Sequence, residues 1–238
     1  MGHMAENEEN VFRFALDRDG LHRQLGGGIP KGTIMILTGK DGTGKSAISQ
    51  RFIYGLLRHE LKCTVISTEL TTKGFIDQME SLNYSAKEDL LSRRLTFVPV
   101  FPLLGQARKR GDFLGRLIKS PQLFAADVIV IDTFSALIKY DIDEDRAFEA
   151  LSFFKKLCGQ SKTFILTFDT EDLSDRVLAP FRSVSDIFIE LKKEVLESNV
   201  EHLMYVTRFG TAQAPVSNTI GFRIEPGAGF IVDITMVS

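Results

Sequence analysis

A glycine-rich segment near residue 40 narrows the possible folds of this chain more than any other part of its sequence. It reads Gly39-Lys40-Asp41-Gly42-Thr43-Gly44-Lys45-Ser46 and matches the pattern G-x-x-x-x-G-K-[ST]. A β-rich apolar run, 33–38, precedes it, and a stretch with apolar residues at helical spacing, 46–61, follows it. In this context the segment is typical of a phosphate-binding loop, where backbone N–H groups and a helix N-terminus surround a phosphate.

The side chains of the loop have separate expected roles. Lys45 is predicted to reach the β- and γ-phosphates of a nucleotide, and the hydroxyl of Ser46 to bind Mg²⁺. Three glycines permit the tight path of the backbone around the phosphate. The candidate nucleotide-binding residues are Gly39, Asp41, Gly42, Thr43, Gly44, Lys45, Ser46, Ala47 and Asp132.

Polar side chains at the ends of three predicted strands extend this site. Asp132 follows the apolar run 128–131 and is the expected second Mg²⁺ ligand beside Ser46, acting through water. Asp127, at the opposite end of the same run, is interpreted as a solvated residue. Glu69 is a candidate general base, although an N-capping or first-turn carboxylate of the following helix explains it equally well. Thr167 is a candidate γ-phosphate sensor or a solvated loop residue.

Alternation of strand-like and helix-like segments predicts an α/β fold with a mostly parallel sheet flanked by helices. After residue 167 the pattern changes to strand-like runs without long helices, which predicts an antiparallel edge at the C-terminus. We expect helices at 72–82, 112–120 and 148–157, and strands at 63–67, 95–98, 127–132, 163–167, 186–192, 203–208, 221–225 and 229–234.

Composition limits the domain organisation and the classes of partner. The 238 residues are 44% hydrophobic and show no repeat or linker, so we expect one domain over 11–238 after a tag remnant and polar start over 1–10. The net charge of −2 offers no general attraction to nucleic acids or anionic membranes. Two isolated cysteines, Cys63 and Cys158, and short apolar runs predict a reduced cytoplasmic protein that meets a membrane only through partners.

These motifs, taken together, resemble the RecA-like ATPases of the KaiC type, and the likeness extends through nearly the whole chain. Within that group, single-domain length and the segment 69–75 are most similar to the accessory ATPases of the archaellum motor. The resemblance rests on 25–32, the phosphate loop, Ser67-Thr68-Glu69-Leu70-Thr71-Thr72, 129–133 and 186–191. It implies ATP and Mg²⁺ as ligands, a hexameric ring, and a place beside the motor ATPase, the membrane platform protein and other cytosolic motor components.

Two departures from the KaiC pattern bear on the expected mechanism. Where related domains carry adjacent glutamates after the second strand, this chain has Thr68-Glu69. The family's K-x-R-G finger appears with Val206 in the lysine position, so Arg208 alone is the candidate finger toward a neighbouring subunit. Loss of such a charge can slow phosphoryl transfer by about 10³-fold. We therefore predict MgATP binding with weak or no hydrolysis, and a nucleotide that regulates assembly.

Other functions are compatible with the same core. Glu69 keeps open an active ATPase or autokinase of the KaiC type, and a structural subunit with a nucleotide as folding ligand is a third possibility. A recombination ATPase acting on DNA is disfavoured by the charge balance. The tight basic clusters are Arg93-Arg94 and Arg108-Lys109-Arg110, the second within a segment, 102–112, where this fold often carries a mobile loop.

Overall fold

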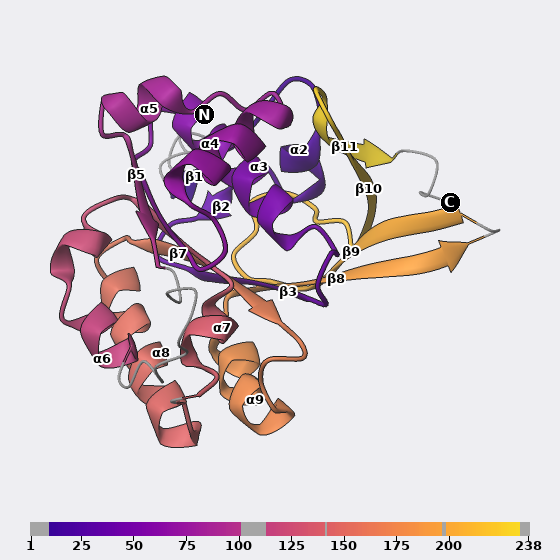
Figure 1. The fold of residues 1–238 in the computed structure, drawn as a ribbon. Helices are drawn as coiled ribbons and strands as arrows, with labels where there is room; N and C mark the ends of the chain where they lie inside the picture. Colours follow the sequence, from indigo (N-terminus) through magenta and orange to yellow (C-terminus); the bar gives the residue numbers. More distant parts are fainter. Residues whose placement is uncertain (1–9, 101–112, 141, 197–198, 234–238) are drawn as a thin grey trace, which may run out of the picture.

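The structure is a computed structural model that describes residues 10–100, 113–140, 142–196 and 199–233 (Figure 1). The expected tag remnant and the basic segment 108–110 lie outside these ranges. A helix-flanked sheet dominates the described part, with strand order β11-β10-β9-β8-β3-β7-β6-β4-β5. Its strands are β3 (Ile34–Gly39), β4 (Cys63–Ser67), β5 (Leu95–Pro99), β6 (Val128–Asp132), β7 (Thr163–Asp169), β8 (Ile187–Leu196), β9 (Asn199–Phe209), β10 (Thr219–Glu225) and β11 (Gly229–Asp233).

The strands from β8 to β5 in this order pair in parallel, so their carboxyl ends meet at one edge of the sheet. Register places Gly39 beside Asp169, and Ser67 beside Asp132. Ligands of parallel α/β sheets bind at this edge because the loops that follow the strands gather there. The fold therefore brings the phosphate loop and the predicted carboxylate together.

Helices cover both faces of the sheet (Figure 1). Alternate residues of β3 show the two cores, since Met35 and Leu37 belong to one apolar cluster and Ile34 and Ile36 to the other. This arrangement explains the uninterrupted apolar sequence of the strand. One face carries α2 (Leu21–Gln24), α3 (Lys45–Arg58), α4 (Thr72–Ser81), α5 (Lys87–Leu91) and the small pair β1 (Val11–Phe12) and β2 (Ile29–Pro30); the other carries α6 (Phe113–Ile118), the 3₁₀ helix η1 (Pro121–Phe124), α7 (Phe134–Ile138), α8 (Glu144–Cys158) and α9 (Asp175–Val184).

The C-terminal part differs from the sequence prediction in two ways. A helix, α9, lies between β7 and β8, and it buries Leu178 and Phe181 one turn apart. With this crossover, β8 pairs in parallel with β3, so the antiparallel edge begins at β9 rather than at 186–192. Both hairpin strands are also longer than predicted. Pro180 inside α9 weakens the helical signal of the sequence.

The helix predicted over 148–157 begins earlier, at Glu144. Its first turn is polar and is capped by Asp143, whose Oδ1 accepts a hydrogen bond of 2.9 Å from the backbone N–H of Arg146. An aspartate at this position satisfies a backbone donor that the helix itself leaves without a partner. The apolar periodicity from which the helix was predicted therefore marks its middle and end but not its start.

Candidate nucleotide-binding site

The phosphate loop connects β3 to α3 at the carboxyl edge of the sheet. Gly42 and Gly44 have φ values of 71° and 98°, in the left-handed region that a side chain disfavours. Within the loop, Thr43 Oγ1 donates a hydrogen bond of 2.8 Å to the carbonyl of Lys40. The loop thus has the strand, turn and helix context that its sequence predicts.

Lys45 points back over the loop rather than into solvent, and its side chain is 8% exposed. Its Nζ donates to the carbonyl oxygens of Gly39 and Lys40 at 2.7 and 2.9 Å, and to Asp169 Oδ2 at 3.1 Å. Sequence reasoning missed Asp169, although it lies two residues after the candidate Thr167. The three acceptors hold the ammonium at the loop, where an incoming phosphate oxygen can replace one of them.

Asp132 lies at the end of β6, 5% exposed, and gathers two of the predicted residues around one oxygen. Its Oδ1 accepts hydrogen bonds from Thr167 Oγ1 at 3.0 Å and from Ser46 Oγ at 3.3 Å. Burial, followed by the nearby Glu69 carboxylate, raises the pKa of Asp132 to about 6, against the opposing effect of the two hydroxyls and Lys45. A cation at this position would offset the cost of the buried negative charge.

The hydroxyl of Ser46 and the carboxylate of Asp132 fit the requirements of Mg²⁺. Both are oxygen donors, which this cation prefers, and their separation of 3.3 Å places them around a common point. The raised pKa of Asp132 shows a carboxylate whose charge the protein alone does not fully compensate. Away from this pair, the described residues include no group of three or more His, Cys, Asp or Glu side chains suited to a metal ion.

Glu69 is placed beside this centre by Thr133. The Thr133 backbone is left-handed, with φ of 55°, and its N–H donates to Thr167 Oγ1 at 2.5 Å while its own Oγ1 donates to Glu69 Oε1 at 2.8 Å. The cap of α4 is a different residue, Thr71, which accepts from the backbone N–H of Gly74. Glu69 is therefore tied to the residue after Asp132 rather than acting as the helix cap.

A hydrogen-bonded chain continues from the loop to α7, and no sequence motif predicts it. Ser135 Oγ accepts from the backbone N–H of Asp169 at 2.9 Å and donates to Asp172 Oδ2 at 2.8 Å. Asp172 Oδ1 in turn accepts from Lys139 Nζ at 2.9 Å. The Lys45 partner Asp169 is thereby fixed to the first turn of the helix that follows Asp132.

Arg208 lies far from the phosphate loop of its own chain. It pairs with Phe188 near the start of β8, at the opposite edge of the sheet from Gly39. Its Nη1 donates to the carbonyls of Arg182, Ser183 and Ser185 at the end of α9, at 2.7, 3.0 and 2.9 Å. Among the described residues, the contacts of its guanidinium are thus with the end of α9 and not with its own loop, and a role toward a neighbouring subunit stays a prediction.

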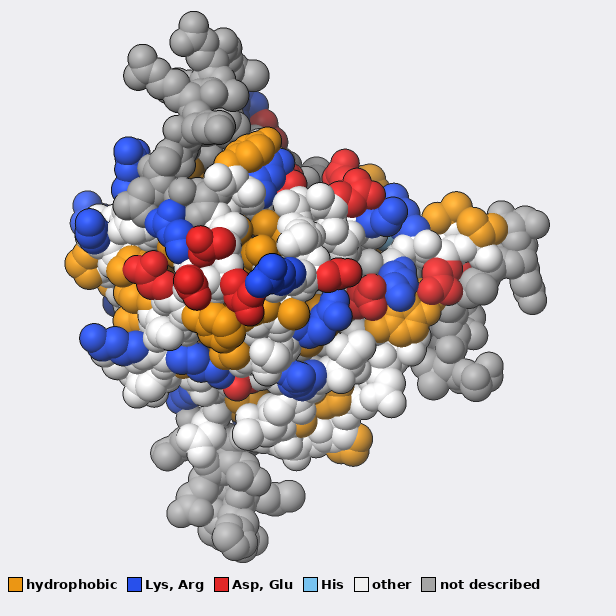
Figure 2. Space-filling view, turned by 90° about the horizontal axis from the view of Figure 1, so that it is seen from below, with side chains coloured by type: hydrophobic (Ala, Val, Ile, Leu, Met, Phe, Trp, Pro, Cys, Tyr) orange, Lys and Arg blue, Asp and Glu red, His pale blue; other side chains and the backbone are white. Residues whose placement is uncertain are grey.

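The predicted basic clusters offer little to a nucleic acid where they are described. Arg94 forms ion pairs with Glu60 and Asp89, and the cluster 108–110 lies outside the described residues. On the face seen in Figure 2, which is formed by the described helices below the sheet, Lys and Arg side chains are interspersed with Asp and Glu. Across the described part of the chain, no helix is both long and apolar enough to cross a membrane.

Comparison with known proteins agrees with this geometry. The family model for the KaiC ATPase matches residues 19–233. The archaeal flagellar ATP-binding protein FlaH of Methanocaldococcus jannaschii is 35% identical over 228 residues, which are 96% of this chain and 98% of that protein. FlaH of Methanococcus voltae is 30% identical over 226 residues, which are 95% and 98% of the two chains.

A solved structure gives the same result in three dimensions. The crystal structure of flagellar accessory protein FlaH from M. jannaschii matches with a TM-score of 0.90 and 35% identity, covering 94% of this chain and 99% of that one. Two relatives are at least 30% identical over nearly their full length, and one family model matches most of the chain. These matches show common family membership in addition to a shared fold. The chain therefore belongs to the KaiC ATPase family and, within it, to the FlaH group.

Proposed function

We propose that this protein binds ATP with Mg²⁺ at the phosphate loop and serves as the ATP-binding component of an archaellum motor. The observation that carries the proposal is the convergence of Lys45, Ser46 and Asp132 at the carboxyl edge of the sheet. The printed names of its relatives, archaeal flagellar ATP-binding proteins, supply the biological setting.

Each group at the site has a role in this proposal. Backbone N–H groups of the loop and Lys45 bind the phosphates. Ser46 and Asp132 would hold Mg²⁺, Asp132 through water, while Thr167 orients the Asp132 carboxylate by donating to its Oδ1. When bound, Mg²⁺ would neutralise part of the negative charge of the phosphates.

Slow hydrolysis is the second part of the proposal. Val206, in the place of the finger lysine, is 6% exposed and pairs with Ile189 in the sheet, so the position belongs to the apolar core. Arg208 donates to three backbone carbonyls at the end of α9, and reaching another subunit would require it to leave them. Both observations support binding without rapid turnover.

A nucleotide that persists at the site can act as a signal. We propose that ATP regulates assembly of this chain into a hexameric ring and its contacts with the motor ATPase, the membrane platform protein and other motor components. The protein would work in the cytoplasm and approach the membrane through these partners. The chain of hydrogen bonds from Lys45 through Asp169, Ser135 and Asp172 to α7 offers a physical route from phosphate to surface.

The test follows ATP bound to the purified protein with Mg²⁺ over hours, measuring the remaining ATP and the released ADP. The Lys45→Ala variant is the control, because it removes the ammonium that meets the phosphates. We expect the wild type to retain ATP largely intact and the variant to retain none. No retention by the wild type would contradict ATP binding, and steady release of ADP would contradict slow hydrolysis.

A second candidate function, an active ATPase or autokinase of the KaiC type, is favoured by one observation. Glu69 is held by Thr133 next to Asp132, and no hydrogen bond within the described part of the chain uses its Oε2, which can therefore accept from a water or hydroxyl nucleophile. The Glu69→Gln variant separates the two functions. An active enzyme would lose turnover while keeping its nucleotide, whereas a binding switch would behave like the wild type in both respects.

A further inference from the structure

Lys193 lies against the phosphate loop, although it is separated from it by 147 residues or more along the chain. A Cβ atom built on Gly42 would lie 3.2 Å from Lys193 Nζ, and no other described atom outside the immediate chain neighbours comes within 4 Å of that position. Gly42 is in the part of the loop whose backbone surrounds a bound phosphate. The ammonium of Lys193 therefore reaches the loop from the side of β8.

The root of the β8–β9 hairpin fixes this position by packing on three loop residues. A Cβ on Gly39 would lie 2.7 Å from the carbonyl oxygen of Leu191, and His202 Nδ1 lies 3.4 Å from the carbonyl oxygen of Thr43. Lys193 and His202 are directly opposite each other in the hairpin. Because residues 191 and 193 of a strand share one face, the register that seats Leu191 on the loop also directs Lys193 toward it.

Charge pairing among the described residues around the loop leaves the Lys193 ammonium uncompensated. Lys40 pairs with Glu171 at 3.2 Å and Lys45 with Asp169 at 3.1 Å. Asp41, the acid nearest in sequence to Gly42, accepts from the Gly42 backbone N–H. Among the described residues, the Lys193 side chain has no hydrogen bond and no ion pair. A phosphate in the loop would supply the missing negative charge.

The neighbouring lysine provides an internal comparison. Lys192 Nζ lies 3.4 Å from Glu190 Oε2 and 5.2 Å from the centre of the Tyr205 ring, on the opposite face of the strand. Tyr205 also donates to Glu194, so the acids of this strand interact on that face. Two adjacent lysines thus have equal charge and different surroundings.

We propose that Lys193 is a second phosphate-binding cation of the site, contributed by the β8–β9 hairpin to the same phosphate chain that Lys45 binds. The inference rests on the proposed function, because it assigns a further residue to that ligand. Nothing in the loop motif predicts it, since Lys193 lies on a strand that reaches the loop through the sheet. Its contribution increases with the negative charge of the ligand and is weakened by salt.

Titration calorimetry with MgATP and with MgADP tests the proposal on the full-length chain. We expect Lys193→Ala to weaken ATP binding about three- to tenfold, a moderate effect because the side chain is exposed. Lys192→Ala is the matched control and should change the dissociation constant less than about twofold. Lys193→Arg keeps the charge and should bind within about threefold of the wild type.

Two readouts separate a phosphate contact from a structural role. The loss in Lys193→Ala should be larger for ATP than for ADP, and it should shrink when salt rises from about 0.05 M to about 0.5 M. Equal affinities of Lys193→Ala and Lys192→Ala would overturn the inference while leaving ATP binding intact. Failure of the wild type to bind ATP would overturn the proposed function itself, and this inference with it.

Discussion

The phosphate loop is contacted by two regions that meet it in different ways. The parallel region, β3 to β7, holds the loop through hydrogen bonds that join a buried group to a partly buried one, such as Lys45 with Asp169 and Asp132 with Ser46. The C-terminal region, residues 187–233, touches the loop through Lys193 and through Phe222 and Ile224, which lie near Gly44. The first region fixes the geometry of the site, and the second covers the loop from outside.

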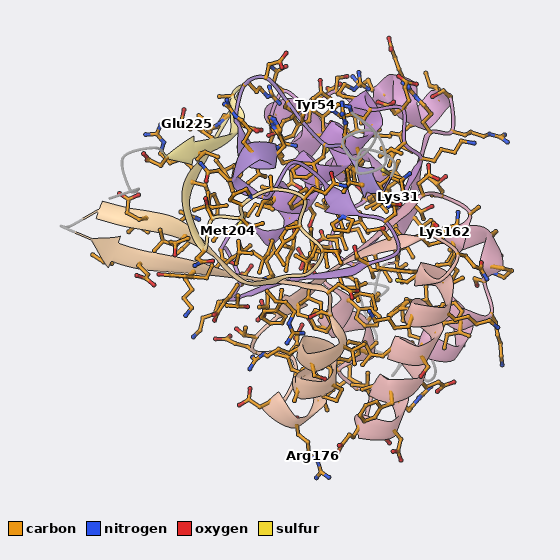
Figure 3. All side chains as sticks on the ribbon, turned by 180° about the vertical axis from the view of Figure 1, so that it is seen from behind. Lys31, Tyr54, Lys162, Arg176, Met204 and Glu225 are labelled. Atoms are coloured by element: carbon orange, nitrogen blue, oxygen red, sulfur yellow. The ribbon has the colours of Figure 1, made fainter. Side chains whose placement is uncertain are left out.

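The two regions also differ in solvent exposure, because the strands of the parallel region are mostly buried and the outer C-terminal hairpin is exposed. Four of the five strands of the parallel region, β3, β4, β6 and β7, are buried over nearly their whole length. The outer part of the β8–β9 hairpin projects from the body beyond Met204, which lies where the hairpin joins the sheet (Figure 3). Evidence that the two regions contribute equally to folding stability would break this comparison.

The largest expected effect is at the ion pair that anchors the N-terminal segment to α3. The side chains of Arg51 and Asp19 are both 0% exposed, with hydrogen bonds of 2.7 Å from Arg51 Nε and Nη2 to the two Asp19 carboxylate oxygens. Arg51→Leu leaves Asp19 buried without its cation, so we expect the free energy of unfolding to fall by about 3–5 kcal/mol. Urea denaturation measures it.

The control for this change lies in the C-terminal region. Arg223 is 55% exposed and lies 3.4 Å from Glu225, so Arg223→Leu should cost less than about 1 kcal/mol. Equal losses of unfolding free energy in the two variants would show that the exposed C-terminal region is as strongly coupled to folding as the buried region. That result would contradict the difference described above.

The second prediction concerns the folding stability that is lost because Asp132 carries a buried negative charge. The pKa of Asp132 is raised from 3.8 to about 6, so the unfolded chain releases this proton at lower pH than the folded chain does. The protonated form therefore stabilises the fold below about pH 4, and this contribution is lost as the pH rises through about 6. Asn does not ionise, so Asp132→Asn should not lose this stability as the pH rises.

Without nucleotide or Mg²⁺ at pH 7.5, we expect the free energy of unfolding of Asp132→Asn to be about 2–3 kcal/mol higher than that of the wild type. Asn keeps an oxygen for Thr167 and Ser46, so the hydroxyl contacts can persist. The gain should vanish near pH 4, where both proteins are neutral at this position. A variant less stable than the wild type at both pH values would contradict the cost assigned to the buried charge.

The third prediction tests the contact between the two regions. Gly44 has φ of 98°, and a Cβ there would lie 2.8 Å from Ile224 Cδ1. Gly44→Ala should lower the free energy of unfolding by about 1–2 kcal/mol, through backbone strain and the steric clash. In an Ile224→Ala background the clash is removed and the strain remains, so the cost of Gly44→Ala should fall by about half. An unchanged cost would show that strain alone acts.

Much of the parallel region follows from local sequence. The loop pattern between an apolar strand and an amphipathic helix predicts the positions of Lys45 and Ser46, and an aspartate at the end of an apolar strand predicts the position of Asp132 beside them. These positions are predictable because parallel strands end at one edge, so spacing along the chain becomes proximity in space.

The remaining site residues depend on backbone paths that the sequence encodes weakly. Glu69 meets Thr133 because Thr133 is left-handed, which a β-branched residue seldom is. Lys193 reaches Gly42 through the register of a strand in which residues 192–194 are polar on both faces, so periodicity gives neither its length nor its pairing. Long-range register, rather than any motif, places these groups.

The smallest expected effect is at the end of the β8–β9 hairpin, where Val195 and Val200 face each other across the strands and are 73% and 62% exposed. Val195→Thr should change the free energy of unfolding by less than about 0.5 kcal/mol, because the side chain is already in water. The same substitution at Val130 in β6, which is 0% exposed, buries a hydroxyl and should cost about 1–3 kcal/mol. Measuring both at low and high protein concentration sharpens the comparison. If Val195→Thr lowered the free energy of unfolding only at high protein concentration, the hairpin end would be buried between copies of the chain. It would then be exposed only in the isolated subunit.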